Sequence, residues 1–313
     1  MTFSPYGLNI FGEPAQAVNR GAIARKFEFP PFSVLNARDG EWQSRKQAWL
    51  SLGIRSEVGR TERAFHDHQW ARDLGQKGLC ANTAGDGTSI FDPVLCELVY
   101  RWFCPEDGLI LDPFAGGSVR GIVACLLGRR YNGIDLRSEQ VQANEDQADS
   151  IIDGNESPLP CWVTGDALDV AELVPGAYDL LFTCPPYADL EKYSDDPRDL
   201  STMDYPKFLD TYRQIIAASV ALLKPNRFAA IMVGDIRDPD GYYRNFVGDT
   251  VSAFQDAGLK LYNEAILVTS VGSLPIRITK QFEAGRKLGK THQNLLVFAK
   301  GSPRWWKKGD KKK

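Results

Sequence analysis

Residues 109–121 read LILDPFAGGSVRG: a short apolar strand, an acid, a turn of small residues and the start of a helix. Glycines in such a turn let a ligand approach the backbone, and the helix N-terminus offers free N–H groups. The next predicted strand ends at Asp135, where a carboxylate can accept hydrogen bonds from both hydroxyls of a ribose. The stretch therefore predicts an α/β fold that binds a nucleoside-like ligand.

Strand and helix patterns alternate from residue 90 to residue 299. Helices are expected over 92–103, 119–127, 138–150, 205–223 and 246–257, and strands over 109–111, 131–134, 161–164, 180–183, 228–233, 261–268 and 294–299. Repeated strand–helix–strand units predict a mostly parallel, doubly wound sheet. No helix separates the last two strands, so the final strand is expected to run antiparallel.

The sequence divides into three parts. Residues 1–85 have weak periodicity and predict an N-terminal extension of loops and short helices, including one near 43–52. This extension is a candidate lid over a cofactor or a DNA contact. Residues 86–302 form the predicted α/β domain, and residues 303–313 form a basic tail.

Composition excludes several classes of protein. The 313 residues are 43% hydrophobic and 25% charged, as in an ordinary globular protein. No apolar run approaches the roughly 20 residues that span a bilayer, and no secretory signal is visible, so we expect no membrane segment. Six cysteines without a CxxC pair indicate reduced thiols and a cytoplasmic protein. His66-Asp67-His68 is interpreted as a polar loop, so no metal site is expected.

Charge is unevenly distributed along the chain. Residues 274–313 carry 12 Lys and Arg against two acids, whereas the rest of the chain is acidic. Clusters of basic residues bind polyanions by releasing counterions from phosphates, so DNA is the expected partner. The predicted loop 269–293 holds the candidate DNA-binding residues Arg277, Lys280, Arg286, Lys287 and Lys290. His292, at its end, is interpreted as a phosphate or backbone contact.

The most specific motif is Cys184-Pro185-Pro186-Tyr187, which follows the strand at 180–183. Two consecutive prolines hold the chain extended and remove two N–H donors. Carbonyl oxygens and an aromatic ring are then left to face the cleft. Such a surface can stack on a flat base and accept hydrogen bonds from its exocyclic amine.

Together these motifs resemble the DNA amino-methyltransferases, which methylate N6 of adenine or N4 of cytosine. DPFAGGS resembles their cofactor motif, CPPY their catalytic motif, and residues 87–103 the helix-leading motif before the glycine turn. Residues 30–57 and 273–301 are similar to phage and prophage DNA methylases, some of which serve restriction–modification. The resemblance implies a Rossmann-like methyltransferase fold and S-adenosylmethionine as cofactor.

The resemblance also implies roles for individual residues. Asp112 is expected near the amino group of the cofactor, Asp135 at its ribose and Asp166 at its adenine. The other expected cofactor contacts are Phe91, Phe114, Ala115, Gly116, Gly117, Ser118, Leu136 and Ala167. Cys184, Pro185, Pro186 and Tyr187 are expected to hold the flipped base and its amine.

Two departures from the family pattern leave alternatives open. Ser118 replaces a loop glycine, and Cys184 stands where the family has Asp, Asn or Ser. A thiol is a weaker hydrogen-bond acceptor than a carboxylate, so the backbone carbonyls of the motif would accept more of the hydrogen bonding. Cys184 also suggests attack on cytosine C6, as in methylation at C5. RNA as substrate, a non-catalytic nucleic-acid-binding relative and a homodimer also stay open.

Overall fold

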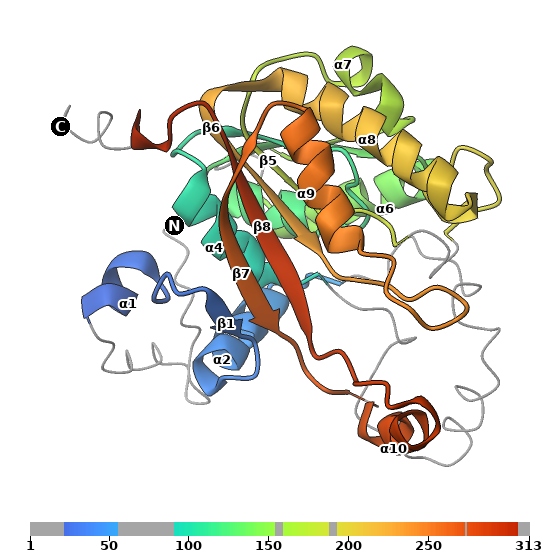
Figure 1. The fold of residues 1–313 in the computed structure, drawn as a ribbon. Coiled ribbons are helices and arrows are strands. Elements are labelled where there is room, and N and C mark those ends of the chain that lie inside the picture. Colours follow the sequence, from blue (N-terminus) through green and yellow to red (C-terminus); the bar gives the residue numbers. More distant parts are fainter. Residues whose placement is uncertain (1–21, 56–90, 154–158, 188–192, 273, 306–313) are drawn as a thin grey trace.

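A single mixed sheet forms the centre of the molecule. The computed structural model describes residues 22–55, 91–153, 159–187, 193–272 and 274–305 (Figure 1). The eight strands lie in the order β1-β7-β8-β6-β5-β2-β3-β4. Their bounds are β1 Val34–Asn36, β2 Leu109–Asp112, β3 Arg130–Asp135, β4 Cys161–Thr164, β5 Tyr178–Thr183, β6 Leu223–Val233, β7 Lys260–Val268 and β8 His292–Lys300.

Among the described strands, β8 alone runs antiparallel to its neighbours, β6 and β7. The order β4-β3-β2-β5-β6-β8-β7 is that of a Rossmann-like methyltransferase sheet, as the sequence predicted. Every parallel strand therefore ends at the same edge of the sheet. Strand β8 begins at that edge, because it runs the other way.

Helices cover both faces of the sheet. Their bounds are α1 Ala22–Phe27, α2 Gly40–Leu50, α4 Pro93–Phe103, α5 Val119–Leu126, α6 Ser138–Ile151, α7 Val170–Leu173, α8 Tyr205–Leu222, α9 Phe246–Asp256 and α10 Leu274–Gly285, with short 3₁₀ turns at Ala167–Asp169, Leu200–Thr202 and Pro303–Trp305. Alternate strand residues contribute to two hydrophobic clusters: one contains residues of α4 and α5, and the other residues of α8 and α9. Side chains on a strand alternate between the two faces, so both faces are buried.

Helix α4 begins where the sequence predicted. The carboxylate of Asp92 accepts hydrogen bonds from the backbone N–H groups of Val94 (3.0 Å) and Leu95 (3.4 Å), and Pro93 occupies the first turn. An acceptor at this position satisfies donors that have no partner within the helix. Asp92 is thereby held at the edge of the sheet where the parallel strands end.

The N-terminal part contributes more than the predicted loops and short helices. Strand β1 pairs in parallel with β7 and extends the sheet. Helix α2 packs on α4 through a buried ion pair, in which Nε of Arg45 lies 2.6 Å from Oε2 of Glu97. The indole N–H of Trp49 donates to the same carboxylate oxygen at 2.9 Å. A three-residue strand has too short an apolar pattern to stand out in the sequence.

The connection between β7 and β8 also differs from the expected loop. Residues 274–285 form helix α10, which lies apart from the sheet beyond the ends of the two strands (Figure 1). Within the described parts of the chain, no helix is long and apolar enough to cross a bilayer.

Candidate functional site

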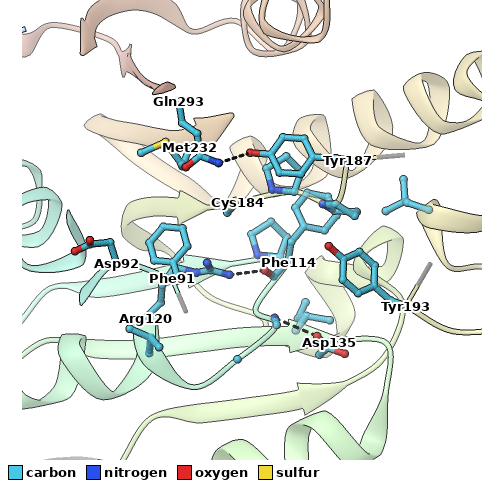
Figure 2. A pocket seen from close by; sticks show the side chains of 18 of the residues that line it. Phe91, Asp92, Phe114, Arg120, Asp135, Cys184, Tyr187, Tyr193, Met232 and Gln293 are labelled. Carbon is cyan, nitrogen blue, oxygen red and sulfur yellow. Dashed lines mark hydrogen bonds between the residues drawn. The ribbon is translucent and has the colours of Figure 1, made fainter. Parts of the chain in front are cut away.

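A cavity of about 550 Å³ opens at the edge where the parallel strands end (Figure 2). Its wall contains residues that follow β2, β3, β4 and β5, together with Gln293 near the start of β8. Ligands of doubly wound sheets bind outside the carboxyl ends of the strands. The strand order thus brings distant motifs to one place.

The turn after β2 holds its backbone close to the cavity. Gly116 has a φ of +51°, in the left-handed region that favours glycine. Its N–H donates to Oδ2 of Asp135 at 3.0 Å, and its carbonyl accepts from Nδ2 of Asn144 at 2.7 Å. A Cβ built on Gly117 would meet no atom within 4 Å, and Gly117 lines the cavity. A side chain at position 117 would therefore occupy space that a ligand can use.

Two carboxylates line the cavity beyond this turn. Asp135 ends β3, and its Oδ1 accepts from the backbone N–H of Arg137 at 2.9 Å. Burial raises the pKa of Asp135, against the lowering effect of the N–H donors of Arg137 and Gly116. Asp166 follows β4; its Oδ1 accepts from Leu168 N–H, and its second oxygen has no hydrogen-bond partner among the described residues. Both carboxylates, for which contacts with a ribose and an adenine were predicted, line the cavity.

Asp112, which was expected near the amino group of the cofactor, does not line the cavity. Its carboxylate is fully buried behind the cavity wall and accepts hydrogen bonds from Arg120 Nε (2.5 Å), Tyr131 Oη (2.7 Å) and Thr183 Oγ1 (2.6 Å). The backbone N–H of Phe114 is a further donor, at 3.2 Å. With these donors no oxygen of Asp112 is left for a ligand, and Asp112 contacts the cavity wall through Arg120 and the backbone of Phe114. Asp92 is the carboxylate that lines this part of the wall.

Arg120 is a cavity residue that the sequence analysis missed. It lies on α5, is 5% exposed and lines the cavity. Its Nη2 donates to the carbonyl oxygens of Phe114 (2.6 Å) and Ala115 (2.7 Å), and its guanidinium lies 4.5 Å from the ring centre of Phe91 (Figure 2). Burial opposes its charge, but Asp112 raises the pKa of the guanidinium. The signal in the sequence that could have identified Arg120 was a single Arg within a helix of small apolar residues.

The Cys184–Tyr187 segment leads directly from β5 into the cavity, and all four of its residues line the wall. Tyr187 packs edge-on against Phe246, with ring centres 6.2 Å apart. Its hydroxyl accepts a hydrogen bond from Nε2 of Gln293 at 3.1 Å. Burial, followed by the neighbouring Cys184, raises the pKa of Tyr187 well above its ordinary value. The ring is thus held neutral and in a fixed orientation beside Cys184.

The N-terminal segment and the edge of β7 close another side of the cavity. Ala37, Gln43 and Lys46 come from the β1–α2 region, and Thr269 and Ser270 follow β7. Lys46 Nζ lies 3.3 Å from Oδ2 of Asp92. None of these positions was singled out from the sequence, because only the pairing of β1 with β7 brings them to this edge.

The remaining predicted cofactor residues separate into two groups. Phe91, Phe114, Leu136 and Ala167 line the cavity with the glycines and the two carboxylates. Ala115 and Ser118 do not: Ala115 is fully buried, and the Ser118 hydroxyl donates to Gln147 Oε1 at 2.7 Å. Both residues support the turn from the side that faces away from the cavity.

None of the predicted DNA-binding residues lines the cavity. Lys280 lies on α10 and is exposed, as is Arg286 just after it. Lys290 is half-buried, its Nζ lies 3.4 Å from the carbonyl oxygen of Asp235, and burial lowers its pKa. A Cβ added at Gly234, beside the cavity residue Gln293, would lie 3.5 Å from Lys290 Nζ. Lys287 is half-buried near Gly241, and the side chain of Arg277 is outside the described residues.

The described residues contain no group of His, Cys, Asp and Glu side chains that could hold a metal ion. His66-Asp67-His68 lies outside the described residues. His292 is exposed at the first position of β8.

The sequence matches no protein-family model and no curated protein. Solved structures of similar fold include TrmN from Thermus thermophilus, with 15% identity over 67% of this chain and 49% of that one and a TM-score of 0.45. Magnesium protoporphyrin IX methyltransferase from Synechocystis PCC 6803, solved with bound S-adenosylmethionine, has 14% identity over 77% of this chain and all of that one, with a TM-score of 0.43.

A candidate DNA modification methylase from Thermus thermophilus, TTHA0409, is 23% identical over 44% of this chain and 51% of that one, with a TM-score of 0.34. The chain thus spans about half the length of TrmN and of TTHA0409. At these levels of identity the likeness concerns the fold, which the strand order already shows.

Proposed function

We propose that this chain transfers a methyl group from S-adenosylmethionine to the exocyclic amine of a DNA base, at cytosine N4 or adenine N6. One observation carries the proposal: the glycine turn after β2 and the Cys184–Tyr187 corner after β5 line the same cavity. Strands β2 and β5 are neighbours in the sheet, so a donor held by one turn lies beside an acceptor held by the other.

The cavity residues fit this cofactor. Each oxygen of Asp135 accepts one backbone hydrogen bond and keeps a lone pair for a ribose hydroxyl. The second oxygen of Asp166 is available to an adenine amine. Because β4, β3 and β2 are successive neighbours, a ligand with its base at Asp166 and its ribose at Asp135 extends toward the glycine turn and then toward Cys184.

The corner after β5 supplies the acceptor side of the reaction. When bound, S-adenosylmethionine supplies a sulfonium methyl group that an amine nitrogen can take up directly. Pro185 and Pro186 have no N–H to compete for an amine, so carbonyl oxygens of the corner can accept its hydrogens and turn its lone pair toward the methyl. Tyr187 offers its ring for stacking, and the proton released from the amine passes to water. Fixed orientation of the reacting groups is the main source of the rate enhancement.

We assign contacts with the DNA backbone to the basic residues on and after α10. Lys280 and Arg286 are exposed, and Lys290 lies just before β8, three residues from the cavity residue Gln293. Cationic side chains near the mouth of the site would contact phosphates next to an extruded base. The part of residues 1–85 that the structure describes closes one wall, which agrees with a covering role for this extension.

Methylation of nucleic acid by the full chain tests this function. The protein is incubated with tritium-labelled S-adenosylmethionine and either unmethylated duplex DNA or RNA, and the nucleosides are analysed by mass spectrometry. N4-methylcytosine or N6-methyladenine in DNA is the expected product. Methylated nucleosides in RNA alone would contradict the proposal and indicate an RNA methyltransferase. The product 5-methylcytosine in DNA would contradict it and indicate methylation at C5 through Cys184. Failure to bind S-adenosylmethionine in calorimetry would indicate a non-catalytic relative.

A further inference from the structure

The cavity contains a cation that the proposed base and cofactor contacts leave unused. Arg120 is held rigidly: Nε donates to Asp112, Nη2 donates to two backbone carbonyls, and the guanidinium lies over the ring of Phe91. Its Nη1 has no hydrogen-bond partner among the described residues, although the side chain is 95% buried and lines the cavity. Nη1 is not among the side-chain atoms that are shut off from solvent, so it faces the cavity with donors that a ligand can use.

We infer that Arg120 binds the carboxylate of the cofactor's amino-acid part through Nη1, so that this end of the cavity is a specific carboxylate subsite. The inference rests on the proposed function and deepens it. Guanidinium groups are suited to carboxylates because their N–H donors are planar and stay charged. Three bonds already fix the guanidinium, so little side-chain entropy remains to be lost when a ligand binds.

The order of the strands determines which end of the ligand meets Arg120. Asp166 and Asp135 follow β4 and β3, so the nucleoside lies at that end. Arg120 lies on α5 just beyond the glycine turn of β2, and its Nη2 donates to two carbonyl oxygens of that turn. The end of the ligand opposite the base therefore reaches the guanidinium. Asp92, on the same part of the wall, places an anion where the ligand's ammonium group can meet it.

Three other cations line the cavity: Arg137, near Asp135, Arg198, which is paired with Asp196, and Lys46, which lies beside Asp92 and is the rival to Arg120. The Nζ of Lys46 is already 3.3 Å from Asp92, and its side chain is 25% exposed. A ligand carboxylate gains less binding free energy from a partly solvated lysine that is already paired with an acid. It gains more from a desolvated guanidinium whose N–H₂ group has no partner. Lys46 therefore gives a matched control for Arg120.

Calorimetry with two ligands tests the inference on the unaltered protein. S-adenosylhomocysteine carries the carboxylate, and its decarboxylated analogue lacks only that group. We expect the analogue to bind about 10- to 100-fold more weakly, since a hydrogen bond to a charged group contributes about 1.5–3 kcal/mol. Equal affinities would overturn the inference while leaving cofactor binding intact. Failure of the unaltered protein to bind either ligand would instead contradict the proposed function.

Variants then identify the residue responsible. In the charge-neutral double variant Arg120→Met/Asp112→Asn the preference for the carboxylate should vanish, while affinity for 5′-methylthioadenosine, which lacks the whole amino-acid part, stays unchanged. Lys46→Met should keep the preference. If the buried double variant does not fold, Arg120→Lys provides the test: it keeps the charge next to Asp112 but lacks the planar fork, so its preference should be smaller. A preference lost in Lys46→Met but kept in the Arg120 variants would refute the assignment.

Discussion

The side-chain amide of Gln293 donates a 3.1 Å hydrogen bond to the hydroxyl of Tyr187, and the two residues are 106 positions apart in the sequence. The contact exists because β8 runs antiparallel and starts at the edge where β5 ends. It fixes the ring of Tyr187 in the cavity wall. The ring, rather than its hydroxyl, is the surface that we propose stacks on the target base.

Removing this ring should separate turnover from cofactor binding. In Tyr187→Ala we expect methyl transfer to DNA to fall about 10- to 100-fold, since stacking on an aromatic side chain contributes about 1–3 kcal/mol per base. S-adenosylmethionine affinity, measured by calorimetry, should change little. Tyr187→Phe is the control: it keeps the ring, loses only the hydrogen bonds of the hydroxyl with Gln293 and Cys184, and should keep most of the rate. Full activity of Tyr187→Ala would contradict the stacking role.

Filling the space at Gly117 should block the cofactor without unfolding the protein. Nothing lies within 4 Å of a Cβ at this position and its φ is not positive, so Gly117→Val projects into the cavity rather than into the core. We expect S-adenosylmethionine affinity to fall about 10-fold or more, as overpacking costs about 1–3 kcal/mol. Gly40→Val, at the start of α2 and outside the cavity wall, should keep that affinity. Unchanged binding in Gly117→Val would place the cofactor elsewhere.

Cofactor binding should weaken in acid because of Asp135. Its pKa is raised by burial, so the carboxylate takes up a proton at a higher pH than an ordinary Asp, whose pKa is about 3.9. Affinity for S-adenosylhomocysteine should be constant near neutral pH. It should fall as the pH is lowered through the raised value, because the protonated acid has fewer acceptors for ribose hydroxyls.

Calorimetry from neutral pH down to about 4.5 would follow this change. Asp135→Asn should bind more weakly throughout and lack the inflection. The same inflection in Asp135→Asn would assign the titration to another group.

The basic residues after α10 should determine the salt dependence of DNA binding. Neutralising Arg286, Lys287 and Lys290 together should weaken affinity and reduce the slope of log affinity against log salt by up to about 2.7, or about 0.9 for each phosphate that is no longer neutralised. Fluorescence anisotropy at several salt concentrations measures both. A variant neutralised at Arg25, Lys26 and Lys260, three exposed residues outside the cavity wall, should keep the slope. An unchanged slope in the first variant would rule out this surface.

The buried pair that joins α2 to α4 should be important for stability. In Glu97→Gln the Arg45 guanidinium, which is 2% exposed, loses its hydrogen-bonded carboxylate and keeps only Glu28, whose Oε2 lies 3.3 Å from Nη2. We expect the free energy of unfolding in urea to fall by about 3–5 kcal/mol, as for other buried pairs broken on one side. Arg213→Met, which breaks an exposed pair with Asp256, should cost about 1 kcal/mol or less. Similar losses in both would show that the buried pair has no special role.

The features that depend on local pattern could be predicted from the amino-acid sequence. Apolar periodicity, the Asp-Pro start of α4 and the small residues after β2 indicated the order of strands and helices and the strand ends at which Asp135 and Tyr187 stand. Side-chain periods of 2 and 3.6 and turn chemistry act within a few residues, so one segment is enough to read them.

Which side chains reach the cavity depended instead on the folded arrangement of the whole chain. Folding turned Asp112 inward against Arg120, Tyr131 and Thr183, and it brought Gln293 and Lys46 into the wall from distant segments. These placements depend on strand pairing between residues far apart in the chain, and on the need of a buried carboxylate for several donors. No local pattern in the sequence carries that information.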